Sequence, residues 1–391
     1  MAEPGELPVV PVVVGRADLQ RVIESLLSRG YRVVGPTNVN KALIHDDVSC
    51  VEDFPSGWHD VQAPGAYRLK RNGNPDELFG YAVGASSLKT FLYLPSQRLW
   101  SVNKNDDRLQ IAQEDPEPRK TAFFGARPCE VEAALIQDKV LMQGPYEDSH
   151  YRRLRENCFI VAVNCTSPAE TCFCASMDTG PKARSGFDLA LTEIAGKKDH
   201  LFLVEVGTEK GGEILAEVPH RPATPEETNA ARKLLEAAAK KMKRSIETSE
   251  LPSLLSRNFE NPRWDEVASR CLGCGNCTQV CPTCFCSNFE DSTSLDGGTA
   301  ERRRRWDSCF TIGFSYIHGG SVRSSGKSRY RQWMTHKLGN WVDQFGTSGC
   351  VGCGRCITWC PVGIDITEEA RVIRETDIRK KSGGMEEVRI R

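Results

Sequence analysis

The sequence predicts an α+β protein: an N-terminal α/β domain with a mixed sheet, followed by a mostly helical domain. Two observations lead to this prediction. Short, almost continuously apolar runs, typical of strands covered on both faces, lie in the first half of the chain. Beyond residue 250 the strand-like runs give way to clustered cysteine, glycine and arginine. With 391 residues, the chain is long enough for more than one domain.

The first predicted element is a helix. Apolar residues at positions 19, 22, 23, 26 and 27 have the spacing of one buried helical face. Asp18 is the expected N-cap and Gly30 the expected C-terminal stop. A strand over residues 31–34 should follow and end at Gly35-Pro36. Further strands are predicted at Thr90–Tyr93, Thr121–Phe124, Phe159–Val163 and Leu201–Val206.

A domain boundary is predicted near residue 222. Thr224-Pro225-Glu226-Glu227 has the form of a capping box with proline at the first helical position. It opens a charged, alanine-rich helix that should reach about Ile246. The predicted organisation is an α/β domain over residues 1–222, a helical connector over 223–250 and a helical domain over 251–391.

The composition argues against several classes of protein. The 51 basic and 52 acidic residues give a net charge of −1, so we expect neither nucleic acid nor a membrane as a partner. No apolar stretch approaches the roughly 20 residues that cross a bilayer. The apolar run at residues 9–14 contains Pro11, with no basic residue before it and no cleavage site after it. We therefore expect no signal peptide and a cytoplasmic location.

Seventeen cysteines are many for a protein of a reducing compartment, where they indicate metal or redox chemistry. Eight of them form two repeats with identical spacing, each ending in Cys-Pro. The repeats are Cys271-x2-Cys274-x2-Cys277-x3-Cys281-Pro282 and Cys350-x2-Cys353-x2-Cys356-x3-Cys360-Pro361. This is the spacing of bacterial two-cluster ferredoxins, in which the fourth cysteine ligates the other cluster.

The repeats therefore predict a ferredoxin-type domain with two 4Fe-4S clusters. One cluster is assigned to Cys271, Cys274, Cys277 and Cys360, and the second to Cys350, Cys353, Cys356 and Cys281. The alternatives are two zinc sites, which usually take two separated Cys-x-x-Cys pairs, or free core thiols. The crossed assignment requires the long insertion between the repeats to loop out.

A third 4Fe-4S cluster is predicted from four cysteines of the first half, the alternative being buried structural thiols. They stand at the ends of predicted strands and in the loop that follows, where α/β sheets build their sites. These four are Cys129, Cys165, Cys172 and Cys174.

Other cysteines receive no firm ligand role. The tripeptide Cys172-Phe173-Cys174 recurs as Cys284-Phe285-Cys286, and the second copy has only Cys309 as a companion. These three thiols leave a cubane one ligand short unless Asp307, His318 or water completes it, so a structural role or a place beside the first ferredoxin cluster is favoured. Cys50 and Cys158 are interpreted as core thiols.

No pattern for substrate chemistry is found. The chain has no Gly-x-Gly-x-x-Gly motif after a strand, and its seven histidines form no metal or triad pattern. The glycines and lysine of residues 320–328 depart from the spacing of a phosphate-binding loop, so a flexible loop is expected. Arg302–Arg305 is interpreted as a solvated helix face. We therefore expect a subunit that catalyses no bond-making itself.

Several segments resemble a known family nearly end to end. They are Tyr31–Pro36, Phe124–Cys129, Val163–Cys165, Thr171–Cys174, Thr179–Pro181, Phe187–Leu189, Cys281–Cys286, Trp306–Cys309 and Cys350–Pro361. In these segments the chain resembles the iron–sulfur beta subunit of soluble NADP-linked nickel–iron hydrogenases (sulfhydrogenases). More distantly, it is similar to one of the subunits of anaerobic sulfite reductase. The resemblance adds weight to the four N-terminal cysteines as ligands.

The resemblance implies a heterotetramer. In such complexes a flavin subunit takes electrons from NAD(P)H, and the small and large hydrogenase subunits hold further clusters and the nickel–iron site. This chain would relay electrons between them. The alternatives are an electron-transfer subunit of a sulfite or polysulfide reductase, and a cluster-bearing scaffold protein without redox turnover. Copurifying nickel or siroheme would separate the first two, and clusters that dithionite fails to reduce would indicate the third.

Overall fold

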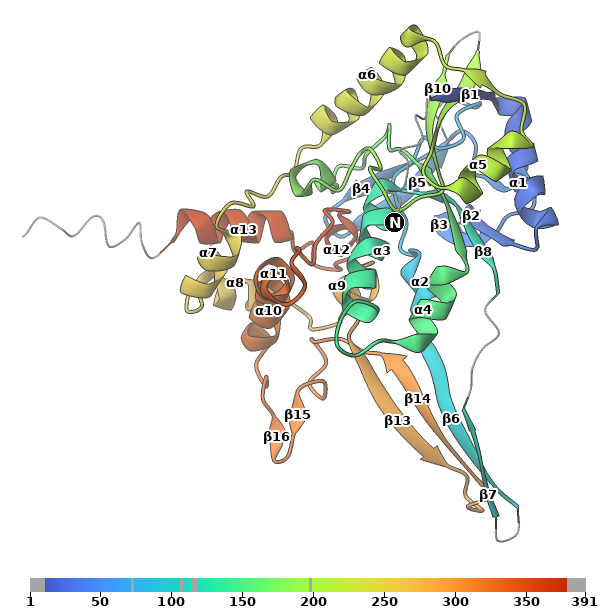
Figure 1. Cartoon of the computed structure of the whole chain (residues 1–391). Coiled ribbons are helices and arrows are strands. Elements are labelled where there is room, and N and C mark those ends of the chain that lie inside the picture. Colours follow the sequence, from blue (N-terminus) through green and yellow to red (C-terminus); the bar gives the residue numbers. More distant parts are fainter. Residues whose placement is uncertain (1–10, 72–73, 106–107, 114–118, 197–198, 378–391) are drawn as a thin grey trace, which may run out of the picture.

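The computed structural model describes residues 11–71, 74–105, 108–113, 119–196 and 199–377. The outer limits of the predicted domains, at residues 1 and 391, and the start of the apolar run at 9–14 lie outside the described residues. Figure 1 shows a large sheet with its helices on one side of the molecule and a group of short helices on the other. A second, narrow sheet projects away from both.

The large sheet has eight strands in the order β12-β1-β11-β10-β9-β8-β2-β3. In chain order they are β1 Val12–Gly15, β2 Arg32–Val39, β3 Ala42–Asp47, β8 Thr121–Ala126, β9 Cys158–Val163, β10 Leu189–Ala195, β11 His200–Val206 and β12 Arg221–Pro222. The four central strands β10, β9, β8 and β2 run parallel, whereas the flanking pairs are antiparallel. The predicted mixed sheet is confirmed.

Helices cover both faces of this sheet. Alternate residues of β8, such as Phe124 and Phe123, belong to different buried clusters. The cluster with Phe124 includes side chains of α1 and α5, and the cluster with Phe123 includes side chains of α3 and α4. The helices of this half are α1 Leu19–Ser28, α2 Lys89–Leu92, α3 Pro128–Leu141, α4 Ser149–Glu156, α5 Glu209–Ala216 and α6 Pro225–Lys241, with 3-10 turns at Arg16–Asp18, Val51–Asp53 and Cys174–Met177. Burial on both faces explains why these strands are so apolar.

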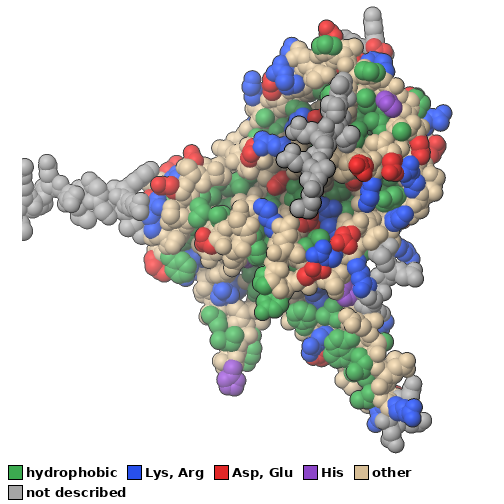
Figure 2. Space-filling model, in the orientation of Figure 1, with side chains coloured by type: hydrophobic (Ala, Val, Ile, Leu, Met, Phe, Trp, Pro, Cys, Tyr) green, Lys and Arg blue, Asp and Glu red, His purple; other side chains and the backbone are tan. Residues whose placement is uncertain are grey.

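The narrow sheet joins the two halves of the chain. Its strands are β6 Ser96–Asn105, β7 Arg108–Gln113, β13 Ser287–Thr293 and β14 Thr299–Trp306, in the order β13-β14-β6-β7. Hydrophobic side chains are visible along this projection in Figure 2. Two further hairpins are β4 Trp58–Ala63 with β5 Ala66–Arg71, and β15 Tyr316–Ile317 with β16 Gly320–Ser321.

The C-terminal half is otherwise built of short helices around an aromatic core. They are α7 Leu251–Arg257, α8 Arg263–Arg270, α9 Asn276–Gln279, α10 Gly326–Thr335, a π-helical turn His336–Asn340, α11 Trp341–Phe345, α12 Arg355–Thr358 and α13 Ile366–Glu375. Trp264, Tyr330 and Trp333 form the centre of the buried cluster that they share. None of the helices in the described ranges is both long and apolar enough to cross a membrane.

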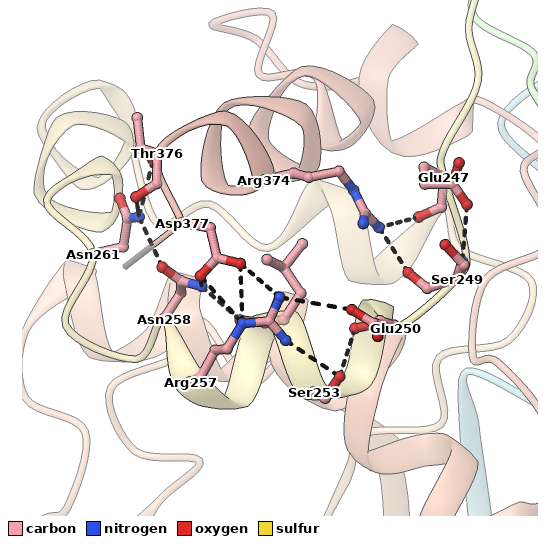
Figure 3. A network of polar contacts seen from close by, with 11 residues as sticks. Glu247, Ser249, Glu250, Ser253, Arg257, Asn258, Asn261, Arg374, Thr376 and Asp377 are labelled. Atoms are coloured by element: carbon pink, nitrogen blue, oxygen red, sulfur yellow. Dashed lines mark hydrogen bonds and ion pairs between the residues drawn. The ribbon is translucent and has the colours of Figure 1, made fainter. Parts of the chain in front are cut away.

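A polar network fixes the end of α13 against α7 (Figure 3). The Arg257 guanidinium donates to both carboxylate oxygens of Asp377 at 2.6–3.1 Å, and Asn258 donates to the same carboxylate at 2.8 Å. Arg374 donates to the carbonyl oxygens of Glu247 and Ser249 at 2.7 and 2.9 Å. The last described helix is thereby tied to the segment that follows α6.

Several local predictions are confirmed. Gly30 follows α1 with φ +81°, as a C-terminal stop requires. The α6 capping box forms as expected, because Thr224 accepts from the Glu227 N–H and Glu227 accepts from the Thr224 N–H. Asp18 precedes α1 without a side-chain capping bond, and α6 ends at Lys241 rather than near Ile246.

Other predictions are wrong. The segment predicted as a strand at Thr90–Tyr93 forms the helical turn α2, from which the buried Lys89 reaches the carbonyl oxygens of Gln279 and Cys284 at 3.2 Å. Strand β2 continues past Pro36, because its pairing with β8 stops at Val34 and the proline then meets hydrogen-bonding demand from one side only.

The C-terminal half also keeps more strand than expected. Arg302–Arg305 lies in β14 and not on a helix, with Arg302 paired to Asp291 at 2.6 Å and stacked over Trp100. Cross-strand charge pairs and aromatic neighbours therefore stabilise a run that has no apolar alternation. The loop expected at residues 320–328 contains strand β16 and the first turn of α10, which Ser325 caps by accepting from the Ser328 N–H.

Candidate iron–sulfur centres

The first three cysteines of one repeat lie beside the fourth cysteine of the other. Cys271 ends α8, Cys277 lies in the short helix α9, and Cys360 follows α12. With the exposed Cys274 they line one pocket, which aromatic side chains including Tyr330 and Trp333 close from the protein side. Burial raises the pKa of the Cys277 thiol, and its three neighbours in this set raise it further.

The second set is arranged in the same way but lies deeper. Cys350, Cys353 and Cys281 are each less than a tenth exposed. Burial raises the pKa of Cys356, and nearby Cys350, Cys353 and Cys281 add to that shift. The crossed grouping expected from the two repeats is therefore present in the fold, with the intervening hairpins and helices looped away from both sets.

Backbone N–H groups point at the sulfurs of both loops. The Gly273 N–H donates to the Cys271 sulfur, and the Gly352 N–H to the Cys350 sulfur, each at 3.4 Å. The Ile364 N–H donates to the Cys360 sulfur at 3.3 Å. Both glycines have positive φ, which allows the loop to turn its amides inward. Such donors stabilise thiolate charge and are one means by which proteins set cluster potentials.

Sequence reasoning missed a buried cation beside the second set. Lys337 is 3% exposed, and its ammonium donates to the Cys281 sulfur at 3.2 Å, the Thr283 hydroxyl at 3.1 Å and the Gly349 carbonyl oxygen at 2.9 Å. The pKa of Cys281 is lowered, first by a hydrogen bond from Cys284 and then, against the effect of burial, by the charge of Lys337. No sequence pattern marked this lysine, because only the fold brings α10 and the first repeat together.

The four N-terminal cysteines also come close together. Cys129 lies in the first turn of α3 after β8, Cys165 follows β9, and Cys172 and Cys174 lie in the loop beyond. Since β8 and β9 are parallel neighbours, their carboxyl ends place Cys129 and Cys165 at one edge of the sheet. Burial raises the pKa of Cys174, and Cys165 and Cys353 raise it further, so this group adjoins the second ferredoxin set.

The contact between these two groups is tight. Gly352 and Gly354 have positive φ, and a Cβ at either position would lie within 2.4–2.7 Å of backbone atoms in the Thr171–Cys174 loop. The Phe173 N–H donates to the Gly352 carbonyl oxygen at 2.8 Å, and the Thr171 and Thr358 hydroxyls are 2.8 Å apart. The cysteine loop of the first half therefore rests directly on the second repeat.

A buried ion pair strengthens the same junction. The fully buried Arg355 guanidinium donates to the Glu130 carboxylate at 2.6 Å and to the carbonyl oxygens of Gly84 and Ser86 at 2.9 Å. Glu130 follows Cys129, and Arg355 lies between two cysteines of the second repeat. Arg127 adds bonds from the other side, donating to the Phe79 and Tyr81 carbonyl oxygens at 2.8 and 2.6 Å. No sequence pattern pointed to these roles.

The remaining cysteines fall into two kinds. Cys284, Cys286 and Cys309 line a separate cavity, whereas neither Asp307 nor His318 belongs to its lining. Cys158 is buried at the start of β9, where the Arg155 guanidinium donates to its sulfur at 3.1 Å. Cys50 precedes the 3-10 turn at Val51–Asp53 and is half-buried.

Comparison with known proteins agrees with this geometry. Residues 270–364 match the family model of a 4Fe-4S dicluster domain. Over 319 residues the chain is 34% identical to the sulfhydrogenase 2 subunit beta of Pyrococcus furiosus, an alignment that covers 81% of this chain and 91% of that subunit. The chain belongs to the sulfhydrogenase beta-subunit family. Sulfhydrogenase beta subunits are thus the family that the sequence segments indicated, whereas the more distant relation to sulfite reductase stays a prediction.

Membership in the sulfhydrogenase beta-subunit family explains the cysteine content. The dicluster match covers both repeats and ends at Ile364, whose N–H donates to Cys360. The alignment with the relative extends well beyond that dicluster segment, so the N-terminal half belongs to the family as well. The chain is an iron–sulfur protein of the electron-transfer type.

Proposed function

We propose that the chain is the electron-transfer subunit of a cytoplasmic NADP-linked hydrogenase complex. It would relay electrons between a flavin subunit that oxidises NAD(P)H and the small and large subunits of a nickel–iron hydrogenase, and would catalyse no bond-making itself. The observation that carries the proposal is the pairing of each fourth cysteine with the opposite repeat, the arrangement of two-cluster ferredoxins.

The residues fit two 4Fe-4S clusters. Each set offers four thiols, inward N–H donors and a largely apolar surround, which together suit a polynuclear sulfide cluster. Clusters held there would accept and donate single electrons. We assign Cys271, Cys274, Cys277 and Cys360 to one cluster, and Cys350, Cys353, Cys356 and Cys281 to the other.

The N-terminal group supports a third cluster. Cys129, Cys165, Cys172 and Cys174 are all buried, and the pKa of Cys172 is raised first by burial and then by Cys174 and Cys165. The group lies against Cys353, so a third cluster would neighbour the second. The role of the tight glycine contacts and the Arg355–Glu130 pair would be to hold the two sites at a fixed separation.

The relative's name supports a hydrogenase over the other assignments. It is called a subunit of a sulfhydrogenase, which favours a nickel–iron module as the electron partner over a siroheme sulfite reductase. A scaffold without redox turnover accounts less well for amides and a buried lysine placed on the sulfurs, since these are features that tune a potential.

Anoxic affinity purification of the natural complex tests the proposal. We expect this chain to copurify with a nickel-containing pair of subunits and with a flavin subunit, and its clusters to be reduced by NADPH through the latter. Copurifying siroheme without nickel would instead identify a sulfite reductase. Clusters that neither dithionite nor the reduced flavin subunit can reduce would favour the scaffold.

A further inference from the structure

We propose that Cys284, Cys286 and Cys309, together with the imidazole of His336, bind a further 4Fe-4S cluster. The three cysteines come from the two ends of the β13–β14 hairpin, and the histidine from the turn after α10. Neither repeat nor the N-terminal group uses these residues. The inference goes beyond the relay described above and does not depend on which subunits the chain contacts.

The four side chains line one cavity. It has a volume of about 330 Å³ and is also lined by Arg323, Lys337, Trp333 and Trp341. The cysteines are more than a ferredoxin repeat needs, and they lie on one wall because β13 and β14 pair from Ser287↔Trp306 onward, which brings the segments just before and just after the hairpin together. The Asp307 N–H donates to the Cys286 carbonyl oxygen at 2.8 Å and closes this wall.

Two indole groups of the lining have no acceptor. Trp333 and Trp341 are 4% and 1% exposed, and neither Nε1 atom has a hydrogen-bond partner among the described residues. Buried N–H groups without an acceptor are uncommon in folded proteins. The sulfides of a bound cluster accept such hydrogen bonds, so a cluster in this cavity would supply a partner to donors that otherwise lack one.

The charge of the lining suits an anionic ligand. Lys337 is buried beside Cys281, and Arg323 lies at the same cavity. A 4Fe-4S cluster with thiolate ligands carries net negative charge, which buried cations would offset. Lys89 contributes from behind, since its ammonium is 3.2 Å from the Cys284 carbonyl oxygen.

His336 has the properties of a fourth ligand. Its Nε2 atom is 3.1 Å from the Gln344 side-chain oxygen, so Nε2 carries the proton and Nδ1 keeps a lone pair. Histidine ligands usually fix their second nitrogen through such a bond. His336 also begins the π-helical turn His336–Asn340, a local departure from α-helix that is frequent at functional sites.

The cavity adjoins both ferredoxin sets. Trp333 lines this cavity and the pocket of the first set, and Cys309 neighbours Cys277. On the other side, Cys284 hydrogen-bonds to Cys281 of the second set. A cluster here would therefore be a branch point beside two other clusters rather than an isolated structural site. Among the described residues no three Cys, His, Asp or Glu side chains surround a single ion.

The experiment compares iron and acid-labile sulfide in anoxically purified full-length chain. C286A/C309A should lose about four irons and four sulfides per chain relative to the wild type, whereas the control C50A should lose none. H336A should leave three thiolate ligands, convert part of the site to a 3Fe-4S form on oxidation and show a new EPR signal in the oxidised protein. H336C should retain all of the iron.

Three outcomes would overturn the inference. They are unchanged iron in C286A/C309A, loss of a single zinc ion in place of iron, and iron and EPR spectra of H336A identical to those of the wild type. If C286A/C309A does not fold, the count in wild type decides. About four irons must then remain beyond those removed by substituting the ferredoxin and N-terminal cysteines. A wild-type chain without any iron would refute the proposed relay itself, which is a distinguishable result.

Discussion

Lys337 is the residue whose charge bears most directly on the second ferredoxin set. It is buried, and three acceptors including the Cys281 sulfur surround its ammonium. Burial alone lowers the pKa of this lysine, but the thiols of Cys281, Cys284 and Cys350 raise it by more, so the cation persists inside the protein. A fixed cation stabilises the reduced form of a neighbouring cluster, because reduction adds negative charge.

Removing this cation should lower a cluster potential. We expect Lys337→Met to shift the midpoint potential of the second ferredoxin cluster downward by about 50–100 mV, as Coulomb interaction over several ångströms at an effective dielectric of about 20 implies. EPR-monitored redox titration measures the shift. The exposed lysine variant Lys240→Met, on α6, serves as the control and should change nothing. A potential that stays constant or rises in Lys337→Met would contradict the argument.

The Arg355–Glu130 pair should matter for stability. Both side chains are buried, so Glu130→Gln leaves the guanidinium without its anion and should cost about 3–5 kcal/mol of unfolding free energy. Chemical denaturation under anoxic conditions measures this, with the exposed Glu226→Gln as the matched control. The double variant Glu130→Gln/Arg355→Met should recover part of the loss. Equal stability of Glu130→Gln and wild type would show that the pair is not stabilising.

Sequence reasoning reached the cysteines and not the residues that hold them. The spacing of the two repeats is a local pattern, so the thiols of both ferredoxin sets could be named and grouped, and the fold brings those groups together. Lys337, Arg355 and His336 belong to no local pattern. Each acquires its role from contact with a segment more than 50 residues away or from a helix turn that only the packed chain imposes.

Among the elements, the two cysteine loops differ in what surrounds them. Gly273 and Gly352 hold the same place in the two repeats, and both have positive φ. Nothing lies within 4 Å of a Cβ added at Gly273, whereas a Cβ at Gly352 would be 2.6 Å from the Cys174 nitrogen. One loop faces open space and the other carries the cysteine loop of the first half.

This difference gives a matched pair of variants. Gly273→Ala should cost only the strain of positive φ, about 1 kcal/mol, and keep the full iron content. Gly352→Ala should in addition displace the Thr171–Cys174 loop and reduce the iron of the N-terminal site by up to about four per chain. Iron analysis and thermal unfolding measure both effects. Similar iron loss in the two variants would mean that the contact with the Cys174 loop is unimportant.

The large sheet was predictable and the narrow one was not. The strands of the large sheet are buried on both faces and so are apolar, which marks them in the sequence. Strand β7 is exposed throughout and β14 is rich in arginine, and their stability comes from pairing between segments far apart in the chain. For the same reason Thr90–Tyr93 is a helical turn despite its β-branched and aromatic residues, since Lys89 is anchored by the C-terminal half.

Considered as a whole, the molecule joins its two halves at the cysteine groups. The N-terminal cysteine loop rests on the second repeat, and the narrow sheet takes strands from both halves. The division into domains at residues 222 and 250 stays a prediction, although α6 begins at Pro225 as its capping box requires. The junction places every candidate cluster site within one contiguous region of the fold.

The chain should need a partner to use a nicotinamide. Its sequence has no dinucleotide-binding fingerprint, so we expect the isolated chain to be reduced by dithionite but not by NADPH. Addition of the flavin subunit should restore reduction by NADPH, which can be followed by the loss of visible iron–sulfur absorbance under anoxic conditions. Direct reduction of the isolated chain by NADPH would show that it carries a nicotinamide site of its own.

The most direct test of the account is EPR spin quantitation of the anoxically purified, dithionite-reduced chain. The thiols of the two repeats are grouped to hold two 4Fe-4S clusters, so the reduced protein should show at least about two unpaired spins per chain, with the spin–spin coupling of neighbouring clusters. Protein that stays EPR-silent after reduction, and that contains zinc in place of iron and sulfide, would contradict it.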